Sequence, residues 1–194
     1  MSRIDAVRPG EAADEEANQL LHEAREGWYC DSAFFGAMAH QPELLKRLVD
    51  VFDAFPQSDG IDAELLELMR LRVAENHECA YCSTVRTQEV RDEVAPKERA
   101  VFGEIDPTLL TTREELAVRL VDYLSEDPHR ITDEFFDRLS EVYSEDEVIE
   151  LLLFGCLEVG LDRFSIALEL DTDEESSYPS GLEYPFERSS PDGQ

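Results

Sequence analysis

Two cysteines three positions apart, Cys79 and Cys82, are the residues whose types and spacing best suit a chemical reaction. Cys79 is expected near the N-cap of a helix and Cys82 in its first turn, where free backbone N–H groups and the helix dipole favour the thiolate. A thiolate attacks a peroxide or a disulfide, and the second cysteine then resolves the product as an intramolecular disulfide. The pair therefore predicts a redox-active dithiol.

A metal site and a pair of inert thiols are the alternatives to this interpretation. Zinc takes four ligands, and the sequence contains no second Cys-x-x-Cys and no His-x-x-x-His. His77 can add a third ligand, but the fourth is missing, so we expect neither a metal nor a cofactor. Cys30 and Cys156 are expected in the core, and Cys156, inside the apolar run 151–157, is expected to be an inert buried thiol.

Helical patterns separated by turn signals organise the chain, and no convincing alternating strand pattern appears. Before the cysteines we expect helices over 11–27, 32–40, 42–55 and 63–76, with Pro42 opening the third and Asp62 capping the fourth. After Cys82 the helix is expected to continue to about Glu93, and a short piece follows at 96–102. The fold class is therefore predicted to be all-α.

Capping signals mark the later helices. The four residues from Thr112 predict a helix to Ser125, Thr132 predicts one over 133–142, and the four residues from Ser144 predict one running to about Leu170. We therefore expect a frayed N-terminus over 1–13, one helical domain over 14–170 and an irregular acidic tail over 171–194. The tail contains three aromatic residues, Tyr178, Tyr184 and Phe186. They indicate that part of the tail docks, for example on a neighbouring subunit; the alternative is a fully solvated tail.

The charge balance is extreme, with 46 acidic against 17 basic residues and a net charge of −29. Only two of the basic residues are lysines, Lys46 and Lys97. Such a charge repels itself at low salt and is tolerated when salt screens it, which favours a halophilic host over a merely acidic mesophilic protein. Nucleic acid and anionic membranes are poor partners for this charge. No apolar run is long enough to span a bilayer, and Met1 to Asp5 lack a signal segment, so we expect a cytoplasmic protein.

The sequence around the cysteines resembles the carboxymuconolactone decarboxylase superfamily, and within it the AhpD-like alkylhydroperoxidases. Glu67 stands twelve residues before Cys79, and Cys79-Ala80-Tyr81-Cys82 matches the Cys-x-Tyr-Cys motif of that family. Two further stretches resemble the helical lead-in and the late helix of the family: 34–46 and 161–168. The resemblance covers about residues 28 to 171 and implies an AhpD-like helical bundle.

The resemblance also implies roles for individual residues. Cys82 would be the peroxidatic thiol and Cys79 the resolving one. The family usually has a histidine four residues after the second cysteine, which links the thiol to the counterpart of Glu67, but this chain has Arg86. An arginine cannot act as a base, so Arg86 either holds the Cys82 thiolate by charge or pairs with a carboxylate on the surface, such as Glu89 or Glu93.

Two site residues have a simpler interpretation from the pattern alone. Periodicity places Glu67 opposite the apolar face of its helix and predicts that it faces solvent, and only the family register moves it into a site. Tyr81 is either a packing residue or a hydrogen-bond donor near the thiols. His40 and His77 are expected at the surface or at helix ends, and Arg163 in an ion pair or a subunit contact.

The leading functional hypothesis is a cofactor-free thiol peroxidase or dithiol oxidoreductase, an antioxidant enzyme of the peroxiredoxin type that an external thiol reductant recycles. Its substrate would be a peroxide or a disulfide. The alternatives are a lyase of the carboxymuconolactone decarboxylase type and a non-catalytic, redox-sensing helical oligomer. A homo-oligomer, a trimer or a multiple of it, is expected from the resemblance and from the apolar run 151–154, which exceeds what one core face needs.

Overall fold

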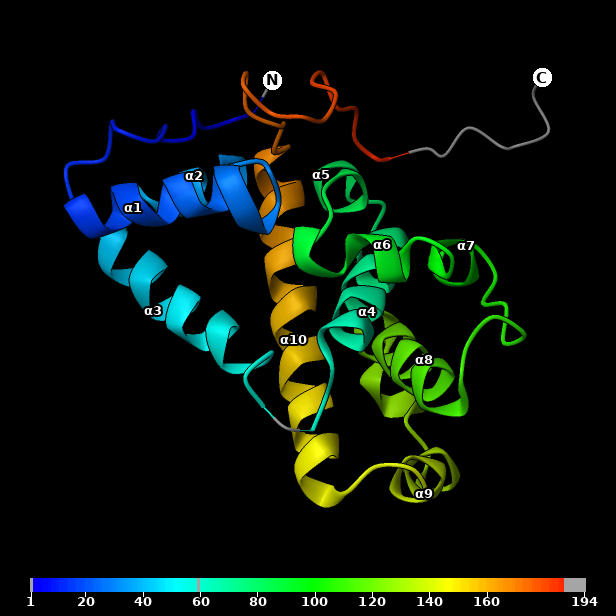
Figure 1. Cartoon of the computed structure of the whole chain (residues 1–194). Helices are drawn as coiled ribbons and strands as arrows, with labels where there is room; N and C mark the ends of the chain where they lie inside the picture. Colours follow the sequence, from blue (N-terminus) through cyan, green and yellow to red (C-terminus); the bar gives the residue numbers. More distant parts are fainter. Residues whose placement is uncertain (1, 59, 187–194) are drawn as a thin grey trace, which may run out of the picture.

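The computed structural model describes residues 2–58 and 60–186, and within these ranges it contains helices and connecting segments but no β-strand. The all-α prediction is therefore confirmed for the described part of the chain (Figure 1). In chain order the α-helices are α1 (Glu15–Glu23), α2 (Ala33–Met38), α3 (Pro42–Ala54), α4 (Ala63–Asn76), α5 (Ala80–Thr84), α6 (Arg91–Val94), α7 (Glu98–Val101), α8 (Thr112–Glu126), α9 (Asp133–Ser140) and α10 (Glu145–Leu168). A π-helix at Ala24–Trp28 extends α1, and 3₁₀ turns lie at Gln88–Val90 and Pro128–Arg130.

The long helix α10 runs through the middle of the molecule and packs with α4 and α8 (Figure 1). Met69, Leu120 and Leu151, one from each of these helices, are fully buried in the shared core. Gly155 lets α10 approach α8 closely, because a Cβ at this position would lie 2.7 Å from Leu124 Cδ1. This packing fixes the two helices, α4 and α10, whose side chains flank the cysteines.

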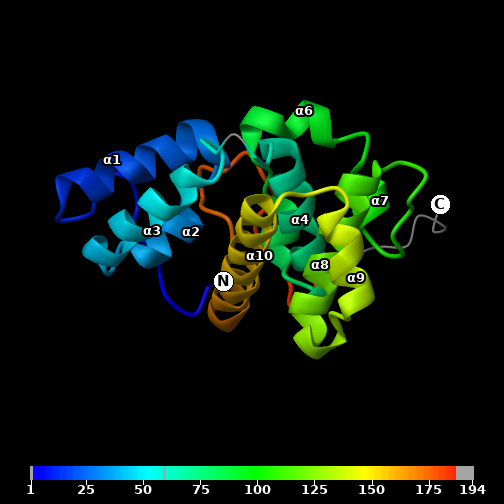
Figure 2. The same cartoon turned by 90° about the horizontal axis from the view of Figure 1, so that it is seen from below.

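Helices α1, α2 and α3 form a separate layer on one side of α10, as the view from below shows (Figure 2). Their buried side chains make a second apolar cluster that includes Leu21, Phe35 and Leu45. Cys79 and Tyr81 belong to the same cluster. The helix carrying the two cysteines is therefore held between the core of α4 and α10 and this N-terminal layer.

Most predicted helix starts agree with the observed ones. Asp62 caps α4 by accepting a hydrogen bond from Leu65 N, and Ser144 forms the expected capping box with Glu147 at the start of α10. The box of α8 begins one residue earlier than predicted, because Thr111 rather than Thr112 is the N-cap that bonds Glu114 N. The helix predicted to run from the cysteines to about residue 93 is wrong: α5 ends at Thr84, and an extended segment precedes the next turn.

Both terminal segments lie along the body of the fold. Arg3 N donates to Leu168 O and Val7 N donates to Gly36 O, so the segment expected to fray is hydrogen-bonded to the body of the fold. The described part of the tail, 171–186, crosses over α5 and donates from Phe186 N to Glu78 O at 2.9 Å. Residues 187–194 of the predicted tail lie outside the described residues, as does Asp59 in the turn before α4.

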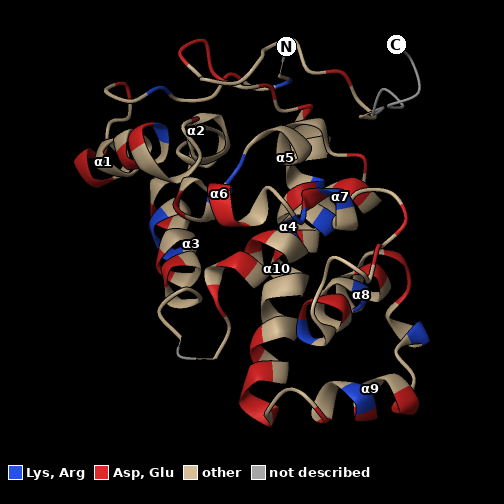
Figure 3. Ribbon diagram, turned by 45° about the vertical axis from the view of Figure 1, so that its right-hand side comes forward, with Lys and Arg blue, Asp and Glu red and all other residues tan. Residues whose placement is uncertain are grey.

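Acidic side chains occur on α1, α3, α9 and the first turns of α10 rather than in one cluster (Figure 3). Within the described residues, no helix combines the length and the apolar character that crossing a membrane requires.

Candidate active site

The Cys79–Cys82 pair opens α5, as the spacing predicted. Cys79 is the N-cap residue, and its sulfur accepts a hydrogen bond from Cys82 N at 3.3 Å. The two sulfurs form a disulfide, with the Cα atoms 5.4 Å apart. Cys79 is fully buried, whereas Cys82 is half-buried. Of the two sulfur-bearing residues, Cys82 is therefore the one that a small molecule can reach.

Asp162 on α10 is the carboxylate beside these sulfurs. One of its oxygens and the two sulfurs all lie within 4.8 Å of one another. Its Oδ2 atom lies 2.7 Å from Nδ1 of His77, the C-cap residue of α4. Burial raises the pKa of the Asp162 carboxyl, and the hydrogen bond from His77 opposes this only in part. A buried carboxyl with a raised pKa, close to two thiols, can accept and return a proton.

The same three residues are the group in the described chain that comes nearest to a metal site. Cys79, Cys82 and Asp162 offer three ligand atoms, one fewer than tetrahedral zinc takes. A thiol binds zinc as a thiolate, so the disulfide seen here has no thiolate to offer. The donor set therefore does not fit a closed structural zinc site.

Glu67 is buried, at 3% exposure, and the prediction from periodicity that it faces solvent is wrong. Its two oxygens accept from Nε and Nη2 of Arg70 at 2.7 and 2.6 Å. Thr87 adds a hydroxyl hydrogen bond at 2.7 Å. Burial alone would raise the pKa of the Glu67 carboxyl, but the Arg70 charge and these hydrogen bonds outweigh it and hold the pKa below its usual value.

Arg70 connects this ion pair to the cysteine helix. Its Nη1 donates to Cys82 O at 2.8 Å and its Nη2 donates to Val85 O at 2.9 Å. Arg70 therefore links the Glu67 carboxylate to the backbone around Cys82.

The Arg86 guanidinium contacts the carboxylate of Glu98, which was not named among its expected partners. Its guanidinium makes a two-pronged ion pair with Glu98, with Nε 2.7 Å from Oε1 and Nη2 3.0 Å from Oε2. It also donates to Ser83 O and lies 5.7 Å from the ring centre of Phe102. Arg86 therefore pairs with a carboxylate, as one of the two interpretations expected, but the partner is Glu98 rather than Glu89 or Glu93. These contacts hold the Arg86 side chain against α7 and the end of α5.

Tyr81 both packs and donates a hydrogen bond. It is 2% exposed, and its hydroxyl donates to Asp31 Oδ1 at 2.6 Å. Burial raises the pKa of the Tyr81 phenol, and the nearby Asp31 charge adds to the effect. The hydroxyl is committed to Asp31, so Tyr81 ties α5 to the loop before α2.

The tail covers the other side of the cysteine helix. Tyr184 accepts from Tyr81 N at 3.1 Å through its hydroxyl, which donates to Leu170 O at 2.7 Å. The Tyr178 hydroxyl accepts from Arg86 N at 3.0 Å. The aromatic residues of the tail therefore dock on their own chain, directly over the helix that carries the dithiol.

Cys156 is placed differently from what the pattern predicts: it is exposed on α10, so its assignment as a buried thiol is wrong. Arg163 donates to Ser125 O at the end of α8, and the subunit contact expected for it stays a prediction. His77 ends a helix as expected, and His40 is exposed and bonded to Asp5 O.

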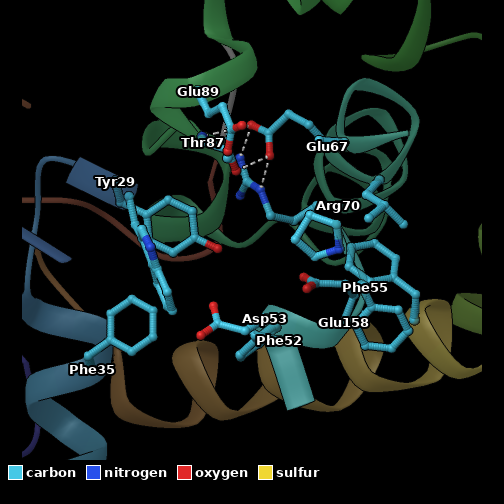
Figure 4. Close-up of a pocket in the computed structure, with 15 residues that line it drawn as sticks. Tyr29, Phe35, Phe52, Asp53, Phe55, Glu67, Arg70, Thr87, Glu89 and Glu158 are labelled. Atoms are coloured by element: carbon cyan, nitrogen blue, oxygen red, sulfur yellow. Dashed lines mark hydrogen bonds and ion pairs between the residues drawn. The ribbon is translucent and has the colours of Figure 1, made fainter. Parts of the chain in front are cut away.

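One cavity adjoins Cys82, and a second, larger cavity lies next to it. The small one is lined by Cys82, Tyr81 and Asp162, and it shares Tyr29, Arg70 and Glu158 with its larger neighbour. Figure 4 shows the larger cavity, with Arg70 between the Glu67 carboxylate and the open space. Its volume is about 200 Å³.

The pattern did not assign a role to Asp162 or Glu158. Both are acidic residues in the mostly apolar stretch 151–168 of α10, four positions apart and therefore on one face. An acidic pair of this spacing in an apolar stretch is a signal in the sequence that could have identified them.

No family model matches the chain. The protein YdfG of Bacillus subtilis, described as uncharacterized, is 26% identical over 132 residues, which are 66% of this chain and 88% of that protein. An uncharacterized protein of Mycobacterium tuberculosis is 28% identical over 137 residues, 68% of this chain but only 47% of the mycobacterial protein.

Three solved structures share the arrangement of helices. An uncharacterized peroxidase-related protein from Ralstonia eutropha, described as having an alkylhydroperoxidase AhpD core, has a TM-score of 0.68 at 16% identity over 90% of this chain and 93% of that one. The chain has the AhpD-like fold. A peroxidase-related protein from Silicibacter has a TM-score of 0.71 at 10% identity, with 90% and 93% covered. A variant of the debrominase Bmp8, in complex with 2,3,4-tribromopyrrole, has a TM-score of 0.68 at 16% identity, with 89% and 92% covered.

Proposed function

We propose that this AhpD-like protein is a cofactor-free dithiol oxidoreductase that reduces peroxides at Cys82 and resolves the product with Cys79. The observation that carries the proposal is the disulfide between these residues at the start of α5, with the Asp162 carboxyl beside both sulfurs. The resemblance to the carboxymuconolactone decarboxylase superfamily, and to its alkylhydroperoxidases in particular, supports the same chemistry.

The difference in exposure between Cys82 and Cys79 supports this order of steps. The half-buried Cys82 thiolate attacks the terminal oxygen of the hydroperoxide, so that the O–O bond breaks, Cys82 becomes a sulfenic acid and an alkoxide leaves. The buried Cys79 thiolate then displaces hydroxide from the Cys82 sulfur, which forms the disulfide and, after protonation, water. Two external thiols reduce the disulfide and leave as their own disulfide.

Asp162 is the group placed to manage the protons of these steps. It takes the proton of the Cys82 thiol before the attack and returns it to the departing alkoxide, while His77 holds its carboxyl in place. Arg86 has no part in this relay, because its guanidinium is bonded to Glu98. The Asp162–His77 pair therefore supplies the acid–base function for which the family usually has a histidine after the cysteines.

The cytoplasm is the compartment that suits this cycle, because thiol reductants there keep a dithiol available for the next turnover. Two alternatives share the fold: a lyase of the carboxymuconolactone decarboxylase type and a redox sensor that forms the disulfide without turnover. The debrominase among the similar structures indicates that the fold accommodates other reactions.

A stopped-flow peroxide assay in high salt, with a dithiol reductant, tests the proposal. Wild-type protein is expected to consume peroxide over many turnovers, and Cys82→Ser to lose this activity. Cys79→Ser should react once and retain a sulfenic acid that dimedone labels. Cys156→Ser is the matched control, since that exposed thiol lies outside the site. No peroxide consumption by the wild type, or consumption that survives Cys82→Ser, would reject the proposal, and a single disulfide-forming event would indicate the sensor.

A further inference from the structure

The larger cavity, next to the small one at Cys82, has an aromatic wall. Phe35 packs against two other rings of this wall. Its ring centre lies 5.1 Å from that of Trp28 in an edge-to-face contact and 5.9 Å from that of Tyr29 in a stacked contact. Phe52 and Phe55 on and after α3 line the same space. An aromatic wall offers the negative faces of its rings to a ligand, which favours a cation or a flat apolar group.

Glu158 supplies a buried carboxyl that points into this cavity (Figure 4). It is 8% exposed, and among the described residues none donates a hydrogen bond to it. Burial raises the pKa of Glu158 to about 8; the Arg70 charge opposes the shift, whereas Asp162 and Glu67 add to it. A buried carboxyl without a donor is costly when charged, so Glu158 keeps a proton near neutral pH unless a cation pairs with it.

The remaining charges at the cavity leave it negative. Glu67 balances Arg70 in a two-pronged ion pair, so this cation is already neutralised. Asp53 and Glu89 are exposed residues that line the cavity, and the Asp53 carboxylate points toward the open space below Arg70 (Figure 4). Partial burial of the Asp53 carboxyl raises its pKa, and the negative charges of the nearby Glu23 and Asp50 add to this effect. An anion would therefore meet no unpaired cation among the lining residues and would be repelled by Asp53 and Glu89.

We propose that the cavity is a binding site for a small organic cation, an ammonium group on an apolar or aromatic body, whose charge pairs with Glu158 while the rings of the wall surround it. A neutral ligand would leave the Glu158 carboxyl without a charge partner, and an anion would face three carboxyls. The cavity volume of about 200 Å³ suits a molecule of the size of a substituted benzene. This inference is independent of the peroxidase proposal, because binding requires neither thiol.

Trp28, the single tryptophan of the chain, provides the readout. Its fluorescence is followed while benzyltrimethylammonium, benzyl alcohol or benzoate is added to the full chain at constant ionic strength. The cation is expected to bind with saturation and at least tenfold more tightly than the alcohol, and benzoate not to bind. Equal affinity for the cation and the alcohol, or no saturable signal for the cation, would overturn the proposal. The same titration on Cys82→Ser should give the same result whether or not the dithiol reduces peroxides.

Glu158→Gln keeps the side-chain shape and removes the charge, and it should weaken cation binding at least tenfold. Glu145→Gln, an exposed change on the same helix, is the matched control and should leave it unaltered. Circular dichroism checks that the Glu158 variant folds. Unchanged cation affinity in a folded Glu158→Gln would contradict the proposal.

The pH dependence of the wild type decides the question if that variant fails to fold. Cation binding must displace the proton of Glu158 below its pKa of about 8. The affinity for the quaternary ammonium, which has no proton of its own to lose, should therefore rise from about pH 6 to about pH 8 and then level off. A flat profile would reject the pairing with Glu158.

Discussion

Nδ1 of His77 and Oδ2 of Asp162 lie 2.7 Å apart, although 85 residues separate them in the chain. His77 ends α4 and Asp162 lies in the last third of α10, so the contact ties together the two helices that flank the cysteines. The Nε2 atom of His77 is buried and has no hydrogen-bond partner among the described residues. Among the described residues the ring is therefore held by hydrogen bonding on its Nδ1 side alone, at Asp162.

Asp162→Asn should lower peroxide turnover by about two to four orders of magnitude, the usual contribution of a general acid–base group. The amide keeps the shape and the contact with His77 but cannot take up a thiol proton. The measurement is steady-state peroxide consumption as a function of pH, where the loss should be largest below the pKa of the thiol and smaller above it. The exposed Asp146→Asn on the same helix is the control. A turnover rate and pH profile equal to those of the wild type would remove Asp162 from the mechanism.

Arg86→Ala should leave the pH profile of Cys82 alkylation in the reduced protein unchanged, because the guanidinium is bonded to Glu98. The same change should destabilise the fold by about 1–3 kcal/mol, because it leaves Glu98 unpaired and removes the donors to two backbone carbonyls. Iodoacetamide kinetics and urea denaturation measure the two effects. If the alkylation profile instead moves to higher pH, Arg86 holds the thiolate after all.

The local signals of the sequence were sufficient for most of the fold. Asp62 and Ser144 each start a helix through a side-chain hydrogen bond to a nearby N–H group, and Pro42 has the fixed backbone angle that suits a first turn. These interactions span only three or four residues, so the residue pattern contains them completely. The Cys79 N-cap was predicted for the same reason.

The parts that depend on distant contacts were not predictable in this way. Periodicity counts Glu67 as a solvent-facing residue because it is charged, but Arg70 one turn later and Thr87 beyond the cysteines neutralise and bond it in the interior. Asp162 reaches the cysteines only because α10 packs beside α5. The family register placed Glu67 in the site, but nothing local could indicate that Arg86 would turn to Glu98.

Self-association should depend on the exposed apolar face of α10. Ile149 and Leu153 lie one turn apart and are 57% and 61% exposed. Two large apolar side chains exposed next to each other indicate a contact surface for another subunit. We expect light scattering in high salt to give a multiple of the 22.1 kDa chain mass, a trimer by family resemblance. Leu153→Asp should shift the protein toward the monomer.

The control for this change is Ile4→Asp, which alters an exposed apolar side chain in the N-terminal segment. It should leave the mass unchanged. A wild-type protein that scatters as a monomer at all accessible concentrations would contradict the prediction of an oligomer.

Thermal stability should rise with salt. The chain carries a net charge of −29, and raising the ionic strength to about 1 M shortens the Debye length to about 3 Å, which screens repulsion between surface carboxylates. Melting curves in a series of KCl concentrations measure the effect. Choline chloride at equal ionic strength is the control, since screening predicts a similar rise with either cation. A midpoint that is flat or falls toward molar KCl would argue against adaptation to a salty cytoplasm.

Glu67→Gln should destabilise the protein by about 3–5 kcal/mol at neutral pH, because it leaves the buried charge of Arg70 without its partner. Glu64→Gln on the same helix is the control, since Glu64 is partly exposed and only 3.7 Å from Lys97, and its loss should cost about 0–1 kcal/mol. Urea denaturation of the three proteins measures the difference in unfolding free energy.

The pH dependence of the unfolding free energy shows whether Glu67→Gln destabilises the protein by removing the ion pair with Arg70 or by disturbing the packing. The folded state lowers the pKa of this carboxyl from its ordinary value of 4.5, so the unfolded chain takes up the proton first as the pH falls. The stabilisation by Glu67 is therefore complete above the unfolded pKa and is lost as the pH drops through the lower folded value. The gap in unfolding free energy between wild type and Glu67→Gln should shrink over that acidic window. A gap that stays constant through it would indicate that the variant is weakened by packing rather than by the unpaired Arg70 charge.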